Sequence, residues 1–499
     1  MSATPTSFSS FLTDFEASLK YLFHEKSDID TLSLERGLPP EILAGIMSNN
    51  PLSVAIPTEF GGRGSIVKEC LGILAAASYE SLGLSLTFGI NIALFLEPVS
   101  KYANNDVKAP IFSRFLENAN MGGLMITEPD YGSDALSMKS YNAEVENGYK
   151  IKGTKHWQGL TGMADFWLIA SRKQLNGGDL ARDIDFFIAD VSKEKQKIVV
   201  EELFKNPGLY MIPYGLNVVD IEVPRNHRLE PETTGIKMML DILHRSRLQF
   251  PGMGMGFIKR MLDEATSHCR NRIVGTGNLL AIDQVQFQLA RIQSAFTICS
   301  AMCARSSKIS GIAHNLATEG LEANTMKAVV TDLMQESAQL LMQLSGAQGY
   351  KIDHIAGRGI MDSRPFQIFE GSNEMLYGQI AEIVTRSMKK QKESNLFNFL
   401  KSLDQTAQAC LYFKENLSFT INCQLSQRKL IDLGRALGRV VCVGYVLELQ
   451  EKGFRKDLVD NCITMVKQEV AALISSFHFE NTTGVVEDYA QDSAWLDFA

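Results

Sequence analysis

The stretch Phe366-Gln-Ile-Phe-Glu370-Gly-Ser-Asn-Glu374 places the carboxylate of Glu370 between bulky apolar side chains and a flexible Gly-Ser-Asn turn. Poor solvation of a carboxylate favours its uncharged form, which makes Glu370 a candidate proton-accepting base. A simpler alternative is an exposed glutamate near a helix start, with Ser372 or Asn373 capping a helix over residues 375–388. This stretch alone favours the simpler alternative, so other parts of the chain must decide.

Three further segments favour a catalytic interpretation. They are Gly123-Leu-Met-Ile-Thr127-Glu128-Pro129-Asp-Tyr-Gly132-Ser133-Asp134, Ile151-Lys-Gly153-Thr-Lys155-His-Trp157-Gln-Gly159 and Gln343-Leu-Ser-Gly346-Ala-Gln-Gly349-Tyr350. With the Glu370 stretch they closely resemble, in order and spacing, the motifs of the acyl-CoA dehydrogenase family. The family motifs read Thr-Glu-Pro-x-x-Gly-Ser-Asp, Asn-Gly-x-Lys-x-Trp-Ile-Thr, Gln-x-x-Gly-Gly-x-Gly and Tyr-Glu-Gly-Thr. The resemblance extends from about residue 51 to residue 386.

Composition excludes several other classes of protein. A net charge of -8 without a dense Lys/Arg tract argues against a nucleic-acid partner. The eight cysteines form no CxxC pair, which favours a reducing compartment. No basic region followed by an apolar run opens the chain, so we expect a cytoplasmic protein. Residues 81–96 carry no charge but are too short for a normal membrane span, which predicts a buried helix and no stable membrane insertion.

Hydrophobic periodicity predicts helices, then strands, then helices again. Helices are expected over residues 7–23 and from Pro40 to about Met47, and Asn147-Gly148 predicts a β-hairpin turn. Short strands are expected at 166–170, 185–190, 197–202 and 217–223, and long helices at 236–270, 283–315 and 321–345. Apolar stripes near 430–447 and 459–474 predict two more helices.

The predicted fold class is α+β. The resemblance implies an N-terminal helical domain (1–121), a β-barrel-like domain (122–234) and a C-terminal four-helix bundle (235–392). Residues 393–499 continue beyond the usual end of the family and form a predicted helical extension.

Other cofactor sites find no support in the sequence. Gly252-Met-Gly254-Met-Gly256 lacks the spacing and the preceding strand of a dinucleotide-binding fingerprint, so close helix packing explains these glycines better. The histidines are dispersed, and Cys299 and Cys303 have no His or Cys companions. We expect no metal site.

The resemblance implies FAD held between the β domain and the C-terminal helices. Ile126, Thr127 and Ser133 would meet the flavin ring, and Trp157 would pack against it. A neighbouring subunit would complete the site, so the resemblance also implies a homodimer or homotetramer. The remaining implied cofactor-binding residues are Gly159, Ser372 and Glu374 of the same chain and Arg272, Gln284, Gln343 and Gly346 of the neighbour.

The resemblance implies that Glu370 removes the α proton of an acyl thioester while the β hydride leaves to flavin N5. The backbone N–H of Glu370 would hold the thioester carbonyl, and Arg247 would lie near the substrate as a second catalytic group. Some family members place the base at the position of Ser246, so this chain matches the Glu370 type. The implied substrate contacts are Ser133, His244, Arg247 and Gly371.

Departures from the family pattern keep three functions open. Gly159 replaces a threonine whose hydroxyl usually bonds the flavin, and Gly275 stands where the family has an aromatic residue. The first hypothesis is FAD-dependent α,β-dehydrogenation of an acyl-CoA or acyl-carrier-protein thioester, with an electron-transfer flavoprotein as acceptor. The second is an oxygen-using flavin oxidase or hydroxylase of the same fold. The third is an assembly or scaffold protein with a vestigial site.

Overall fold

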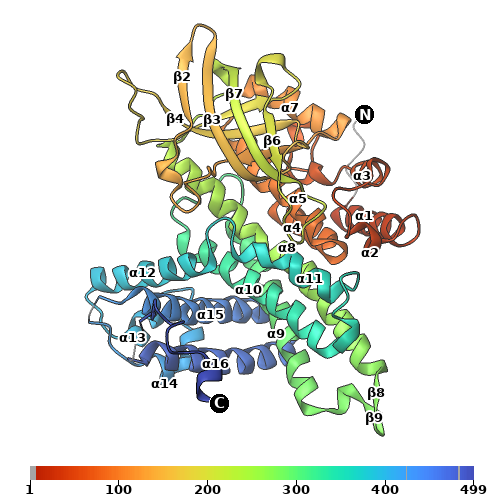
Figure 1. Cartoon of the computed structure of the whole chain (residues 1–499), viewed down its shortest axis with the longest axis vertical. Coiled ribbons are helices and arrows are strands. Elements are labelled where there is room, and N and C mark those ends of the chain that lie inside the picture. Colours follow the sequence, from red (N-terminus) through yellow and green to blue (C-terminus); the bar gives the residue numbers. More distant parts are fainter. Residues whose placement is uncertain (1–6, 423, 481–483) are drawn as a thin grey trace.

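The computed structural model describes residues 7–422, 424–480 and 484–499. The strands and the N-terminal helices occupy one half of the molecule, and the long helices form the other (Figure 1). The predicted α+β class is confirmed. The types of element change near the predicted boundaries, since α7 ends at Asn118, β1 begins at Gly122 and α8 begins at Gly235. We keep the predicted domain boundaries as a proposal.

The N-terminal part is helical, as predicted. Its helices are α1 (Phe8–His24), α2 (Ile29–Leu32), α3 (Pro40–Met47), α4 (Val67–Glu80), α5 (Leu82–Asn91), α6 (Glu97–Tyr102) and α7 (Asn105–Asn118). The segment Leu82–Tyr102 is long and apolar enough to cross a membrane, but 94% of its most apolar window is buried inside the protein. The prediction of a buried helix here is therefore confirmed.

A curled sheet follows, with strand order β1-β4-β2-β3-β7-β6 and β5 paired to β4. The pairs β1–β4 and β2–β4 are parallel, whereas the other pairs are antiparallel. A tight turn joins β2 to β3 near the predicted place, but Val145 pairs with Gly148, so the turn residues are Glu146 and Asn147, one position earlier than the predicted Asn147-Gly148. The strands are β1 (Gly122–Met125), β2 (Tyr141–Val145), β3 (Gly148–Gly159), β4 (Phe166–Lys173), β5 (Asp185–Asp190), β6 (Val199–Leu203) and β7 (Tyr214–Pro224).

The second half of the molecule is built on α8 (Gly235–Asn271), which packs between α4 and α10. A Cβ at Gly256 would lie 1.9 Å from the Ala75 carbonyl oxygen of α4, and one at Gly254 would lie 2.2 Å from Val330 of α10. These two glycines therefore permit close packing, as predicted. The other helices are α9 (Asp283–Ile309), α10 (Gly320–Ser345), α11 (Ile355–Ser363) and α12 (Asn373–Gln391), and the short hairpin β8 (Ile273–Val274) and β9 (Gly277–Asn278) follows α8.

The helix predicted over residues 283–315 ends earlier, at Ile309. The carbonyls of Ser310 and His314 accept hydrogen bonds from the buried Arg245 guanidinium, at 3.0 and 2.8 Å. The backbone N–H of Leu316 bonds the Asp241 carboxylate. Backbone groups of residues 310–316 therefore bond to buried charged side chains of α8 instead of continuing the helix. The local sequence contains no pattern that predicts these distant contacts.

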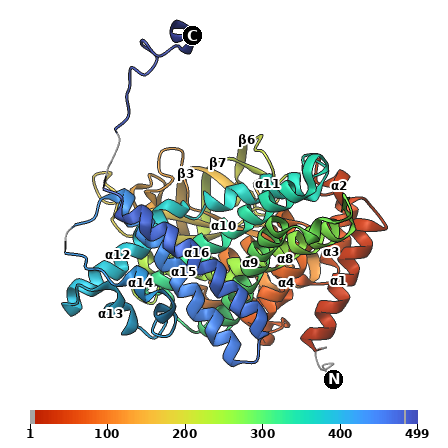
Figure 2. The ribbon, with the colours of Figure 1, turned by 90° about the horizontal axis from the view of Figure 1, so that it is seen from below.

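The two helices predicted near the C-terminus are present as α15 (Gln427–Glu451) and α16 (Lys456–His478), after the short helices α13 (Leu396–Lys401) and α14 (Lys414–Leu417). Helix α15 packs on α12 and α9, and α16 packs on α9 and α15. A Cβ at Gly434 of α15 would lie 1.9 Å from the Tyr377 carbonyl oxygen of α12. The apolar stripes are thus covered by the chain's own bundle, and residues 484–499 lie away from the body (Figure 2).

Candidate active site

Glu370 lies in the loop between the turn Arg364–Gln367 and α12. Its backbone has φ +52, in the left-handed region that side chains other than glycine rarely adopt. Such a conformation costs roughly 1–3 kcal/mol and persists only where the surroundings fix it. The ring of Phe369 packs 4.9 Å from that of Phe366 and 6.2 Å from that of Phe250. These rings give the loop a rigid apolar support.

The Glu370 carboxyl has one bonded and one free oxygen. Its Oε1 accepts a hydrogen bond from Ser246 Oγ at 2.9 Å. Its Oε2 is buried and has no hydrogen-bond partner in the described part of the chain. Burial raises the pKa of Glu370, and the charge of Arg247, the Ser246 hydroxyl and the charge of Lys327 oppose that rise. The carboxyl is therefore not the exposed helix-start group of the simpler alternative, and its free oxygen can accept a proton.

The backbone around Glu370 is fixed on one side and open on the other. Arg247 donates to the Glu370 carbonyl oxygen at 2.8 Å and to Asn324 Oδ1 at 2.7 Å. Among residues 7–422, 424–480 and 484–499, no acceptor receives the backbone N–H of Glu370. A free donor thus lies beside a free carboxylate oxygen, an arrangement that can hold a carbonyl and accept a proton from the adjacent carbon.

Trp157 presents an exposed aromatic face. The register of β3 against β7 shifts between His156 and Gln158, and Trp157 has φ +59 within this bulge. Bulges re-aim side chains, and the Trp157 side chain is 52% exposed although it lies within a long strand. Its ring packs 4.5 Å from Phe204 and 6.2 Å from Tyr214. A broad apolar wall of this kind suits a planar ring system.

Gly159 ends β3 in a crowded place. A Cβ there would lie 2.7 Å from Ile90 Cδ1 and 3.5 Å from the Tyr214 ring. Ile90, on α5, therefore occupies the room that a larger side chain at residue 159 would need. The glycine at this position of the motif therefore has a packing reason.

The segment after β1 is held by buried polar groups. Lys155 donates to the Ile126 carbonyl and to the Glu128 carboxylate, both at 2.9 Å. The Thr127 carbonyl accepts the His156 backbone N–H at 3.0 Å. Ser133 lies exposed a few residues further on. Ile126 and Thr127 are thus fixed beside the strand that carries Trp157, whereas Ser133 is held less firmly.

The start of α12 carries three further predicted residues. Of the two candidate caps, Ser372 is the N-cap, and its hydroxyl accepts the Met375 N–H at 3.4 Å. Gly371 has φ +91, and a Cβ there would lie 2.8 Å from Met375 Cε. Glu374 is exposed in the first turn. Gly371 and Ser372 therefore adjoin the Glu370 cluster, while Glu374 points to solvent.

His244, a predicted substrate contact, is buried and bonded to the backbone. It is 5% exposed, and its Nδ1 lies 2.7 Å from the Leu316 carbonyl oxygen. Burial lowers the pKa of His244 to about 4, so the ring is neutral at physiological pH. Its part in substrate contact stays a prediction.

The other predicted cofactor residues lie at the opposite end of the helices. Arg272 follows the last residue of α8, Gln284 is the second residue of α9, Gln343 lies in the last turn of α10 and Gly346 follows that helix; all four are exposed. Along α8, the 25 residues from Arg247 to Arg272 correspond to roughly 38 Å at 1.5 Å per residue. The hairpin β8–β9 marks this end in Figure 1. One chain therefore presents two separated groups of predicted site residues.

Two models of the acyl-CoA dehydrogenase family match the chain. The middle domain matches residues 123–219 and the C-terminal domain matches residues 233–385, together half of the chain. The chain belongs to the acyl-CoA dehydrogenase family. The resemblance stated from the motifs and the predicted enzyme class, an acyl-CoA dehydrogenase-like flavin oxidoreductase, are therefore confirmed. FAD is confirmed as the cofactor of the family.

Relatives within the family are distant. An acyl-CoA dehydrogenase of Bacillus subtilis is 22% identical over 344 residues, which cover 68% of this chain and 87% of that protein. A mouse mitochondrial very long-chain specific acyl-CoA dehydrogenase is 22% identical over 405 residues, covering 79% of this chain but only 60% of the relative. The FAD-complexed acyl-CoA dehydrogenase structure from Bacillus anthracis has a TM-score of 0.75 at 16% identity. The match covers 96% of this chain and 89% of that one. Its fold match therefore reaches into residues 393–499.

Residues that the sequence did not single out complete the surroundings of Glu370. Lys327 of α10 donates to the Gly371 carbonyl at 2.8 Å, and Asn324 holds Arg247. Tyr214 of β7 contributes a buried phenol whose pKa is raised by burial and by the nearby charges of Asp362 and Glu370. No motif contains these residues, and only the folding of α8, α10 and β7 around the loop brings them to Glu370.

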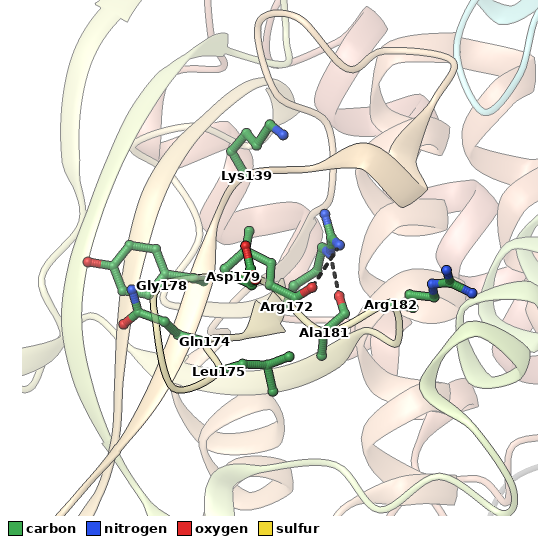
Figure 3. A pocket seen from close by; sticks show the side chains of 10 residues that line it. Lys139, Arg172, Gln174, Leu175, Gly178, Asp179, Ala181 and Arg182 are labelled. Carbon is green, nitrogen blue, oxygen red and sulfur yellow. Dashed lines mark hydrogen bonds between the residues drawn. The ribbon is translucent and has the colours of Figure 1, made fainter.

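A separate cavity of about 750 Å³ lies beside β4 and the loop that leads to β5 (Figure 3). Lys139, Arg172 and Arg182 supply positive charge at its wall, and Asp179 supplies a negative charge. The Arg172 guanidinium is already bonded to the carbonyls of Met138, Leu180 and Ala181. Lys139 and Arg182 are therefore the cations most available to a ligand in this cavity.

Proposed function

We propose that this protein catalyses FAD-dependent α,β-dehydrogenation of an acyl thioester carried by coenzyme A or by an acyl carrier protein. One observation carries the proposal: the buried, unbonded Oε2 of Glu370 lies beside the free backbone N–H of the same residue. Glycine at 159 and the exposed ring of Trp157 leave an apolar face that fits a flavin. FAD, when bound, supplies the hydride acceptor.

The residues of the chain would divide the remaining work. The Glu370 N–H donates to the thioester carbonyl oxygen and so stabilises negative charge that develops there. Glu370 Oε2 then accepts the proton from the α carbon. Arg247 keeps the Glu370 peptide in place through the carbonyl bond at 2.8 Å.

Because burial raises the Glu370 pKa, activity should increase with pH as this carboxyl ionises.

We propose that the active form is at least a homodimer. Arg247, which contacts Glu370, and Arg272 are roughly 38 Å apart along α8 in one chain, at 1.5 Å per residue. An antiparallel partner could bring its Arg272, Gln284, Gln343 and Gly346 to the first chain's Trp157 face. Ile273 and Val274 beside Arg272 are 66% and 49% exposed, which suits a surface covered by a partner.

The carrier of the acyl group bears phosphate in either case. We assign Lys139 and Arg182, at the cavity wall in Figure 3, to that phosphate.

The described cysteines are all free thiols, which supports a reducing compartment, and we propose the cytoplasm. Cys423 lies outside the described residues. We also propose an electron-transfer flavoprotein as the acceptor.

A flavin oxidase or hydroxylase is the second candidate function. The packing of Ile90 against Gly159 favours it, because the site lacks the hydroxyl that the family normally places at the flavin. A scaffold with a vestigial site is a third candidate, supported by the additional helices α15 and α16. It would be indicated by purified protein that neither contains FAD nor takes it up.

The electron acceptor separates the first two candidates. We expect the FAD-loaded protein to turn over repeatedly with an acyl thioester and an electron-transfer flavoprotein, and to form little hydrogen peroxide in air. The enoyl product and the peroxide are measured in the same samples, with Glu370→Gln protein as the background. One peroxide formed per enoyl product in air would show that the oxidase assignment is right.

A further inference from the structure

Helix α10 carries a fully buried lysine beneath the Glu370 loop. The Lys327 side chain has 0% exposure, and its Nζ donates to the Gly371 carbonyl at 2.8 Å and to Asn373 Oδ1 at 2.9 Å. A buried ammonium is costly unless its surroundings compensate for lost hydration. Here two hydrogen bonds to the Glu370 loop compensate for part of that loss.

A second residue of α10 holds the loop on both sides of Glu370. Asp332 accepts hydrogen bonds at 2.7 Å from Gln367, which precedes Glu370, and from Asn373, which follows it. It also accepts the Tyr377 hydroxyl at 2.7 Å. The loop is thus tied to one helix at several points, and Lys327 supplies the tie nearest to Glu370.

Two successive carbonyls of the loop each bind a buried cation. Arg247 of α8 bonds the Glu370 carbonyl, and Lys327 of α10 bonds the Gly371 carbonyl. Together they fix the peptide planes on either side of Gly371, and they hold Glu370 at its unfavourable φ of +52. The free N–H and the free Oε2 of Glu370 depend on this backbone geometry.

The titratable groups around Glu370 come from three elements. Arg247 of α8 and Lys327 of α10 bring positive charge, and Tyr214 of β7 brings a neutral phenol. Burial lowers the pKa of Lys327 to about 7, and the charges of Glu370 and Asp332 oppose that shift and favour the ammonium form. Positive charge near a carboxylate favours its ionised form. Removing Lys327 would therefore make ionisation of Glu370 harder.

We propose that Lys327 is a positioning residue for Glu370: it fixes the loop through two hydrogen bonds, and its charge favours the ionised base. The proposal rests on the proposed dehydrogenation, because it gives Glu370 the role of base. Lys327 itself would not touch the substrate.

Two neutral variants and one charged variant test this. Lys327→Gln can still donate a hydrogen bond but has lost the charge, Lys327→Met has lost both, and Lys327→Arg keeps the charge. Lys308→Met, at an exposed position on α9, is the matched control. For each FAD-loaded protein, flavin reduction by an acyl thioester is followed against pH. We expect the pH midpoint to increase by about one unit or more in both neutral variants, a tenfold loss of ionised base below the midpoint.

A second readout does not depend on turnover. Infrared difference spectra follow protonation of the Glu370 carboxyl with pH, and Glu370→Gln identifies its band. The band midpoint should increase in the neutral variants and stay native in Lys308→Met. If the native protein fails to reduce flavin, the proposed function fails, but this titration still tests Lys327.

The outcomes are distinguishable. A neutral variant that binds FAD and shows the native midpoint and reduction rate would overturn the proposal. If both neutral variants lose FAD, Lys327→Arg decides: recovery of binding and of the native midpoint supports the need for a cation, and failure to recover contradicts it.

Discussion

Glu370→Gln should lower the rate of flavin reduction by an acyl thioester by ~10²–10⁴ or more, the range associated with general acid–base catalysis. The amide has the shape of the carboxyl and can keep the Ser246 contact, which is 2.9 Å in the native protein. It cannot accept the α proton. The backbone N–H of residue 370 is unchanged, so thioester binding should persist. Rapid-reaction absorbance of the flavin measures the rate.

The control is Glu382→Gln on α12, where the native glutamate forms an i,i+4 surface pair with Arg386. Surface pairs of this kind contribute little to stability. The control should keep the native reduction rate, and both variants should keep FAD and the native thermal midpoint. An unchanged reduction rate in Glu370→Gln would remove Glu370 from the role of base.

Mixed dimers should recover an activity that neither parent possesses. One parent carries Glu370→Gln, and the other carries Arg272→Glu with Gln343→Leu. If each site combines Glu370 of one chain with Arg272 and Gln343 of the other, the mixed dimer contains one intact site. The first parent alone should bind FAD without reducing it, and the second should bind FAD poorly.

The two chains are coexpressed with different tags and purified through both. We expect FAD at about half occupancy or more and a flavin reduction rate per intact site near that of the native protein. Mixed dimers without activity, or a native protein that is monomeric while holding one FAD per chain, would contradict the shared site. The position of Arg272 and Gln343, far from Glu370 in the same chain, would then need another explanation.

Local patterns predicted those parts of the fold that depend on neighbours in sequence. The β2–β3 hairpin, a cap at Ser372 or Asn373 and the apolar stripes of α15 and α16 follow from residue type and period, although the hairpin turn lies one residue earlier than predicted. The environment of Glu370 could be predicted only in part. Its apolar neighbours Phe366 and Phe369 are visible in the sequence, and they explain the raised pKa through burial.

Contacts between distant segments could not be predicted. Lys327 and Gly371 are 44 positions apart, and Ile90 of α5 lies against Gly159 at the end of β3. The end of α9 at Ile309 depends on Arg245, which is far away in sequence. These features arise from the packing of α5, α8 and α10, and a single sequence carries no pattern that reports such pairs. The partner of α15 and α16 could not be identified for the same reason.

The most direct test of the central claim is an anaerobic titration of the FAD-loaded native protein with straight-chain and branched acyl-CoA thioesters of several lengths and with acyl carrier protein thioesters. The predicted result is bleaching of the visible flavin band by at least one thioester, with one α,β-enoyl product formed for each flavin reduced. Failure to take up FAD, or a flavin band that no thioester in the panel bleaches, would contradict the account.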